Sequence, residues 1–231
     1  MRLDPPTAIL AVVDPPLLDV LADDDRRRVL IAARRRRFKR GEIVFHFGDP
    51  GDSLHMVTRG HLGMRVTTSL GDTALLRVVG PGDHFGELSV LAPAPRNATV
   101  IALDAAETLS LHGDDLAELR STAPRVDSVL TAALVLEVRR LSTLLVEALY
   151  LPADHRVWRR LHELVGLYRG SEDSADEVVV PFTQEDIAQL AGTTRSTANR
   201  VLREGEVAGV IRLSRGRIAI ADVAQVARKA R

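Results

Sequence analysis

The sequence predicts an α+β protein in three parts: a β-roll of the jelly-roll type, one long helix and a winged helix-turn-helix. Short apolar runs separated by glycine turns fill residues 41–111, which is typical of a β-roll or barrel. A near-heptad pattern follows at residues 126–149. Two capped helices and a hairpin pattern complete the chain. We therefore expect three domains, at residues 1–123, 124–150 and 151–231.

The first part contains five runs with the length and composition of β-strands. The turns between them combine Gly with Asp or Pro, residues that supply positive φ or cap turns. Before these strands, residues 17–33 show helical spacing of apolar residues and predict two short helices. The arginines of Arg34–Arg37 then lead toward the first strand, and we interpret them as facing solvent rather than as a nucleic-acid patch. The predicted strands are Ile43–Phe45, Leu54–Val57, Leu62–Val66, Ala74–Val79 and Thr99–Leu103.

Residues 84–100, HFGELSVLAPAPRNATV, carry the clearest chemistry. Glu87 and Arg96 are nine residues apart, so a short helix and loop can bring both side chains to the opening of the same pocket. Arginine offers a planar fork of donors to phosphate, and backbone N–H groups of Asn97 and Ala98 can complete an anion cradle. An ionised glutamate only accepts hydrogen bonds, which suits a sugar hydroxyl. The pattern predicts a site for a ligand with a phosphate and a sugar; the alternative is a surface Glu–Arg pair beside a turn.

Apolar residues in the predicted long helix step by four, four, three, four and three. Such a seam needs a partner, which is either the surface of its own domain or a second copy of the chain. We favour a parallel homodimer. The proline in Leu151–Asp154 then ends the helix and marks a hinge. The seam consists of Leu130, Leu134, Val138, Leu141, Leu145 and Ala148.

The C-terminal part shows the signature of two helices joined by a tight turn. Thr183 and Asp186 form a capping-box pattern at the start of the first helix, and Thr194 caps a second helix over residues 195–204. Residues 211–220 alternate about a glycine and predict a β-hairpin wing. Six arginines and two glutamates between residues 194 and 217 make this segment basic, as DNA phosphates require. A helical hairpin that binds another protein is the alternative.

Composition excludes several classes of protein. The chain has no cysteine, so it has no disulfide framework and no cysteine-held metal cluster. Net charge is zero, so any charge for nucleic-acid binding must be local. No apolar run reaches 18 residues and the first residues lack an apolar signal sequence, so we expect no membrane association and a cytoplasmic protein. A metal-dependent β-barrel enzyme is a rival because histidines lie near acids, but no His-x-His pair fixes ligands on adjacent strands. These histidines are His46, His55, His61 and His84.

The run Phe-Gly-Glu-Leu-Ser…Pro-Arg-Asn-Ala-Thr-Val resembles the phosphate-binding cassette of cyclic-nucleotide-binding domains. The segment Leu190–Leu202 resembles the recognition helix of the Crp/Fnr family of bacterial transcription regulators, and the similarity extends over residues 17–221. The resemblance implies a homodimer that binds a cyclic nucleotide and a palindromic site in double-stranded DNA, and that contacts RNA polymerase. It implies cyclic AMP as the effector, with cyclic GMP as an open alternative, no metal and no enzymatic activity.

The resemblance also implies functional residues. Ser196 replaces a glutamate of the best-known members, which weakens the expectation that the helix reads a cytosine, and Leu141 with Ser142 replaces their Thr-Ser pair against the base. A ligand-independent regulator of the same fold therefore stays open as a rival. The expected ligand-binding residues are Gly86, Glu87, Leu88, Arg96, Asn97 and Ser142. The expected DNA-binding residues are Thr183, Thr194, Arg195, Ser196, Asn199, Arg200 and Arg215, of which Arg195 and Arg200 match base-reading arginines.

Overall fold

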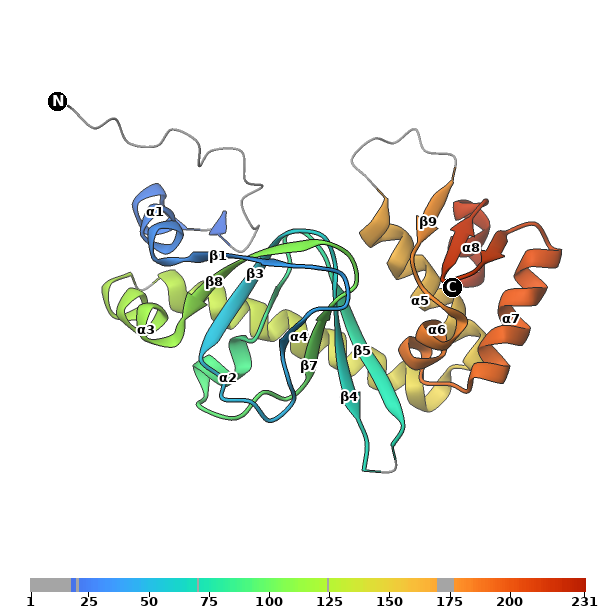
Figure 1. Ribbon diagram of the computed structural model, residues 1–231, viewed down its shortest axis with the longest axis horizontal. Coiled ribbons are helices and arrows are strands. Elements are labelled where there is room, and N and C mark those ends of the chain that lie inside the picture. Colours follow the sequence, from blue (N-terminus) through green and yellow to red (C-terminus); the bar gives the residue numbers. More distant parts are fainter. Residues whose placement is uncertain (1–17, 20, 70, 124, 170–176) are drawn as a thin grey trace. The chain divides into compact units, whose positions relative to one another are not determined.

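The structure is a computed structural model, and it describes residues 18–19, 21–69, 71–123, 125–169 and 177–231 (Figure 1). The described residues form two compact units. One contains the residues up to Leu62 together with Val79–Leu134, and the other contains Gly63–Val78 together with Val135–Arg231. The architecture is α+β, which confirms the predicted fold class. The three domain boundaries drawn from the sequence stay a prediction.

Two four-stranded sheets build the β-rich part. The first has the order β1-β8-β3-β6, and its neighbouring strands are antiparallel. Figure 1 shows β1, β8 and β3 side by side. The second has the order β2-β7-β4-β5. The strands are β1 (Arg34–Phe38), β2 (Ile43–Phe45), β3 (Ser53–Arg59), β4 (Leu62–Thr67), β5 (Thr73–Val79), β6 (His84–Phe85), β7 (Thr99–Ala102) and β8 (Ala106–His112).

The two faces of the first sheet differ in chemistry because side chains alternate along a strand. On one face, apolar residues of β3 and β8 pack into a core with three helices: α1 (Asp23–Ala32), α3 (Gly113–Thr122) and the beginning of α4 (Arg125–Tyr150). The other face carries mostly polar residues, among them Ser53, His55 and Ser110. The core residues from the strands are Leu54, Met56, Leu109 and Leu111.

Several elements differ from the sequence-based expectation. The arginine run is itself a strand, β1, because its backbone pairs with β8 at the edge of the sheet. A single helix, α1, covers residues 23–32, and the first of the two helices predicted there falls partly on residues outside the described ranges. The predicted elements also omitted β6, β8, α3 and α8 (Val223–Lys229). These are short or mixed in polarity, so their periodicity is weak.

Helix α4 is the predicted long helix. Its apolar seam is buried in the first part of the helix and exposed in the second. Leu130 is only 4% exposed and packs in the core of its own unit. Farther along, the seam is bare: Val138, Leu141 and Leu145 are 62%, 50% and 60% exposed. The domain's own core therefore covers the first part of the seam but not the second. The predicted break after the helix is confirmed, since Pro152 precedes α5 (Ala153–Tyr168).

The C-terminal unit contains the predicted helix-turn-helix and wing. The helices are α6 (Gln184–Ala191) and α7 (Arg195–Val207), and the wing is β10 (Ile211–Ser214) with β11 (Arg217–Ile220). Strand β9 (Val178–Val180) adds to β11 as the third strand. The sheet and helices enclose Trp158 of α5 against Gly205 of α7, where an added Cβ would lie 2.6 Å from the indole. This close packing fixes α7 on the domain. None of the helices in the described ranges is long and apolar enough to cross a membrane.

Candidate functional sites

The turn at Gly86 places the first candidate site at the start of helix α2 (Glu87–Leu91). Gly86 has φ 84°, a left-handed conformation that side chains rarely adopt. A Cβ there would lie 2.7 Å from Nη1 of Arg96 and 2.7 Å from the carbonyl oxygen of Ser53. Both the backbone conformation and the space therefore require glycine. Glu87 follows at the first helical position, half-buried, and Leu88 is exposed.

Arg96 is a buried cation, only 2% exposed, and it lies against this helix start. Its guanidinium donates to the carbonyl oxygen of Gly86 at 3.0 Å, to Oγ of Ser53 at 3.0 Å and to Oδ1 of Asp52 at 3.3 Å. Its Cζ also lies 4.1 Å from the ring centroid of Phe45, a cation–π contact. The Nε of Arg96 has no hydrogen-bond partner in the described part of the chain. The site thus holds a desolvated guanidinium whose Nε still lacks an acceptor in the described ranges.

The charges around Arg96 differ from the pair expected from the sequence. Burial lowers the pKa of Arg96, while the charge of Asp52, and to a lesser extent that of Glu87, raises it. The ion pair that the structure forms is with Asp52, whose pKa is in turn lowered by Ser53 and Arg96 against the effect of burial. Glu87 is therefore an electrostatic neighbour of Arg96 that keeps its carboxylate available for another donor.

A polar chain behind Arg96 was not predicted from the sequence. Ser53 Oγ lies 3.2 Å from Nε2 of His55, and Nδ1 of His55 lies 3.1 Å from Oγ1 of Thr108. Burial, together with the charge of Arg96, lowers the pKa of His55 to about 4. With this pKa, His55 is neutral near pH 7. Because the Ser53 hydroxyl donates to Asp52, we infer that the His55 ring donates to Ser53 from Nε2. The pairing of β3 with β8 creates this chain, and a single sequence does not reveal strand register.

The other expected ligand residues occupy varied positions. Asn97 is exposed directly after Arg96, and Ala98 beside it is buried. Ser142 belongs to the second compact unit, where its hydroxyl donates to the carbonyl oxygen of Val138 on the same helix at 2.9 Å. The structure thus groups Gly86, Glu87 and Arg96, while the ligand-binding roles of all six residues stay predictions.

The second candidate site is the helix-turn-helix. The Thr183 hydroxyl accepts from the N–H of Asp186 at 3.1 Å and the Asp186 carboxylate accepts from the N–H of Thr183 at 2.9 Å, so the predicted capping box is confirmed. Thr194 caps α7 by accepting from Thr197 at 3.2 Å. Gly192 adopts φ 58° and ends α6. These caps fix the start of α7, where Arg195, Ser196, Asn199 and Arg200 follow.

The exposed arginines of α7 are held by weak surface ion pairs. Arg200 contacts Glu204 at 2.7 Å one turn along the helix, and Arg195 lies 3.9 Å from Glu185 of α6. Such exposed pairs contribute at most about 1 kcal/mol, so a DNA phosphate or base edge can replace them. Oγ of Ser196 lies 2.9 Å from Oγ1 of Thr194, so this short side chain has a partner at the start of α7. The DNA-binding roles of these residues stay predictions.

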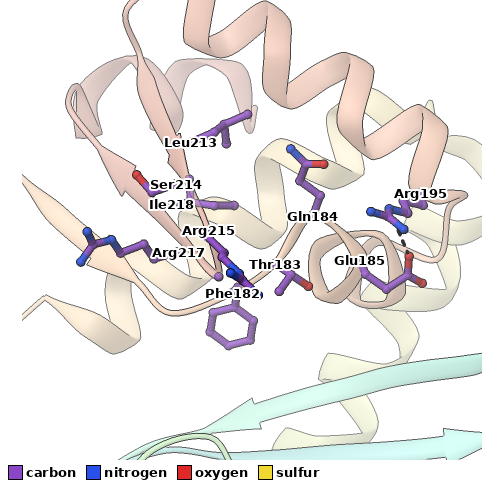
Figure 2. A pocket seen from close by; sticks show the side chains of 11 residues that line it. Phe182, Thr183, Gln184, Glu185, Arg195, Leu213, Ser214, Arg215, Arg217 and Ile218 are labelled. Carbon is purple, nitrogen blue, oxygen red and sulfur yellow. Dashed lines mark ion pairs between the residues drawn. The ribbon is translucent and has the colours of Figure 1, made fainter.

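A cavity of about 360 Å³ lies between the wing and the start of α6. Figure 2 shows Arg215 and Arg217 projecting from the wing and Arg195 beside Glu185 at the start of α7. Glu206 of α7 links the helix to the wing, a role not predicted from the sequence. Its carboxylate accepts from the N–H of Leu213 at 3.0 Å and pairs with Arg203 at 2.7 Å. The bond from Leu213, followed by Arg203, lowers the pKa of Glu206. A basic cavity open to solvent here suits a DNA backbone phosphate.

The histidines considered as metal ligands have other roles in the structure. Nδ1 of His61 lies 2.7 Å from the Asp104 carboxylate, and His46 lies 3.6 Å from Asp49. His55 stacks on Phe85 with ring centroids 5.0 Å apart. Within the described ranges, no group of three or more His, Cys, Asp or Glu residues could hold a metal ion.

A β-roll with a buried arginine at a Gly-Glu turn, combined with a winged helix-turn-helix, defines a ligand-responsive DNA-binding protein. Comparison with known proteins bears this out. Residues 35–123 match the model of the cyclic nucleotide-binding domain, and residues 155–229 match that of the Crp-like helix-turn-helix domain. The chain belongs to the Crp/Fnr family of transcription regulators. It is therefore a cyclic-nucleotide-binding transcription regulator and not an enzyme.

Individual relatives support the assignment. The chain is 32% identical over 194 residues to a CRP-like cAMP-activated global transcriptional regulator of Mycobacterium tuberculosis, covering 84% of this chain and 87% of that protein. It is 30% identical to the cyclic AMP receptor protein of Thermus thermophilus, over 81% of this chain and 83% of that one. The crystal structure of the Thermus thermophilus catabolite activator protein matches with a TM-score of 0.54 at 29% identity, covering 93% and 98% of the two chains. The c-di-GMP responsive regulator CLP of Xanthomonas campestris shares the fold, with a TM-score of 0.73 at 21% identity over 86% and 99%.

Proposed function

We propose that this regulator responds to cyclic AMP and binds a palindromic operator as a homodimer. The observation that carries the ligand proposal is Arg96, a guanidinium buried beside Gly86 with its Nε unpartnered in the described part of the chain. A buried cation is stabilised by anions, and the carboxylate that pairs with Arg96, Asp52, is itself 64% exposed, so a ligand phosphate can add to it or replace it. Two relatives of comparable length are named for cyclic AMP, which supports this ligand over other anions.

The contacts follow from the chemistry of each group. Arg96 binds the cyclic phosphate, exchanging its exposed neighbour Asp52 for the ligand's oxygens. The carboxylate of Glu87 accepts a hydrogen bond from the ribose hydroxyl. Gly86, Leu88 and Asn97 line the sugar-phosphate with their backbones, and Ser142 contacts the base. Cyclic AMP is favoured, and cyclic GMP differs only at the base end, where this chain departs from the best-known members.

The homodimer proposal rests on the second half of α4. Val138, Leu141, Leu145 and Leu149 lie along one side of the helix, and each is at least half exposed. Four large apolar side chains at near-heptad spacing stabilise a helix pair when a second copy covers them. A parallel pair of α4 helices places the two recognition helices in a two-fold arrangement, which matches a palindrome with half-sites about 34 Å apart.

The proposed mechanism is a population shift. Ligand bound at Arg96 and Glu87 favours one arrangement of the paired helices, and the arrangement sets the separation of the two α7 helices. The operator-bound dimer then contacts RNA polymerase in the cytoplasm. No resident metal takes part in this scheme.

Calorimetric titration of the purified protein with cyclic AMP and cyclic GMP tests the ligand proposal. Saturable binding of cyclic AMP at one site per chain, tighter than that of cyclic GMP, is the expected result. Binding of neither nucleotide would favour the rival, a ligand-independent regulator of the same fold. Elemental analysis of the same sample checks for bound metal, which we expect to be absent.

A further inference from the structure

A second cavity, of about 450 Å³, opens on the polar face of the first sheet. It lies within the first compact unit and within the size range of small-ligand sites. Neither Glu87 nor Gly86 lines it, so it is distinct from the turn where the cyclic nucleotide is proposed to bind. Its wall is rich in arginine: Arg34 and Arg36 of β1 line it together with Arg96.

Strand pairing explains why two of the four consecutive arginines face this cavity. Arg34 is opposite Ser110 of β8, and Ser110 is opposite His55 of β3, so these three side chains form one row across the polar face. Arg36 lies two residues along the same strand and points the same way. Arg35 and Arg37 alternate to the opposite face, where both pair with Glu107, at 3.5 and 3.2 Å.

The two arginines that line the cavity, both solvent-exposed, have no such neutralising partner. In the described ranges, no ion pair or side-chain hydrogen bond involves the guanidinium of Arg34 or Arg36. The carboxylates that line the cavity are already engaged, Asp52 by Arg96 and Ser53, and Asp49 by the N–H of His46. Three arginines therefore face two occupied carboxylates, and the cavity carries an excess of positive charge.

Two features suit this wall to a doubly charged ligand. Side chains two positions apart on a strand are separated by roughly 7 Å, so the two guanidiniums can hold two anionic groups at once. The floor adds the hydroxyl of Ser110, which can donate or accept without adding charge. Beside it lie Ser53 and the neutral ring of His55, which are already hydrogen-bonded to their neighbours. A diphosphate offers a separate anionic group to each guanidinium, whereas a single phosphate must be shared between them.

We propose that this cavity is a second anion site, which binds a diphosphate or a similarly compact diphosphorylated metabolite through Arg34 and Arg36. The site shares Arg96 with the proposed cyclic-nucleotide contacts but does not include Gly86 or Glu87. A metabolite bound here lies against the guanidinium that is proposed to bind the cyclic phosphate, and its negative charge stabilises that guanidinium.

Inorganic pyrophosphate is the probe, titrated by calorimetry into the full-length protein at constant ionic strength, with inorganic phosphate in a parallel arm. The test variant is R34Q/R36Q. The matched control is R35Q/R37Q, which removes the same charge from the same strand on the other face. We expect pyrophosphate to bind the wild type and the control at least tenfold more tightly than phosphate, and to bind R34Q/R36Q at least tenfold more weakly.

No pyrophosphate binding by the wild type, or equal weakening in both double variants, would overturn the proposal. Thermal unfolding without ligand shows whether each variant is folded. Cyclic AMP titrated into the same variants distinguishes the two sites. R34Q/R36Q should retain cyclic-nucleotide binding, because it leaves Gly86, Glu87 and Arg96 unchanged. Failure of cyclic AMP to bind any variant, with pyrophosphate behaving as expected, would overturn the cyclic-nucleotide proposal and leave this one standing.

Discussion

Nη1 of Arg96 donates a 3.0 Å hydrogen bond to the carbonyl oxygen of Gly86, the residue that precedes Glu87. This bond joins the two ends of the segment that the sequence marked as a ligand site. It holds a buried cation at the start of α2, where the first N–H groups of the helix also favour an anion. The absence of a side chain at Gly86 is what allows the guanidinium to approach this closely.

Substitution of Gly86 tests this close approach. Gly86→Ala should abolish cyclic-nucleotide binding, because its Cβ would lie 2.7 Å from Nη1 of Arg96 and displace the guanidinium. Gly41→Ala is a matched control: Gly41 also has a positive φ, of 82°, but its added Cβ meets nothing within 4 Å. Both variants carry backbone strain of about 1–3 kcal/mol. Calorimetry with cyclic AMP should show loss only in Gly86→Ala; equal affinities in the two variants would argue against the assigned geometry.

Burial of His55 predicts a pH dependence of stability. The unfolded chain binds a proton at His55 near the ordinary pKa of 6.5, whereas the folded chain does so only near pH 4. Between these values the unfolded state holds more protons, so the free energy of unfolding should fall as pH falls, by up to roughly 3 kcal/mol. Above pH 6.5 the contribution of His55 is constant.

Urea unfolding at pH 7, 5.5 and 4.5 measures this change. His55→Gln removes the titrating ring and should flatten the profile across the window even if it lowers stability at pH 7. A His55→Gln profile parallel to that of the wild type would show that another group is responsible.

Much of the fold follows from local signals in the sequence. The caps at Thr183 and Thr194, the break at Pro152 and the wing over residues 211–220 all depend on side chains a few positions apart, and all are confirmed. The strand formed by the arginine run was missed because its pairing with β8 joins residues about 70 apart in the chain. Local propensity does not encode such pairing.

The candidate sites also combine residues predicted from local sequence with residues brought together only by long-range pairing. Glu87 and Arg96 stood out because their chemistry lies within one short segment. Asp52 and Ser53, which contact the guanidinium, and His55, which contacts Ser53, lie at the start of β3 or just before it. They are more than 40 residues earlier in the chain and meet Arg96 only through the fold. The register of β3 against β8 and β6 decides which of their alternating side chains face Arg96. The proposed partner of the exposed half of α4 is a second copy of the chain, which a single sequence does not reveal.

Charges placed on the bare part of the α4 seam should dissociate the proposed dimer. Leu141→Glu with Leu145→Glu puts two carboxylates in an interface that excludes water, at a cost of several kcal/mol. Analytical ultracentrifugation at micromolar concentration should show a dimer for the wild type and a monomer for the variant. Leu136→Glu is the control, since Leu136 is 65% exposed but lies about 140° around the helix from Leu141. A monomeric wild type would rule out the dimer proposal.

The two classes of DNA contact should separate in a binding-site selection. Arg200→Ala should lose about 1–3 kcal/mol at one guanine and flatten the preference there, because arginine reads O6 and N7 of guanine together. Arg215→Ala in the wing should weaken binding to all sequences alike and lower the salt slope by about one. Ser196 should leave a softer position between the two firm G·C positions of each half-site. If both variants shifted affinity equally on every sequence, Arg200 would contact phosphate only.

The most direct test of the whole account is the affinity for the selected operator, measured by fluorescence anisotropy as cyclic AMP is added to wild type and to Arg96→Ala. We expect cyclic AMP to tighten binding by the wild type. Arg96→Ala should lose about 2–4 kcal/mol of cyclic-nucleotide affinity, because the phosphate no longer has its charged partner, so the tightening should appear only at far higher nucleotide concentration. Operator affinity that does not change with cyclic AMP in the wild type, or that responds equally in Arg96→Ala, would contradict the account.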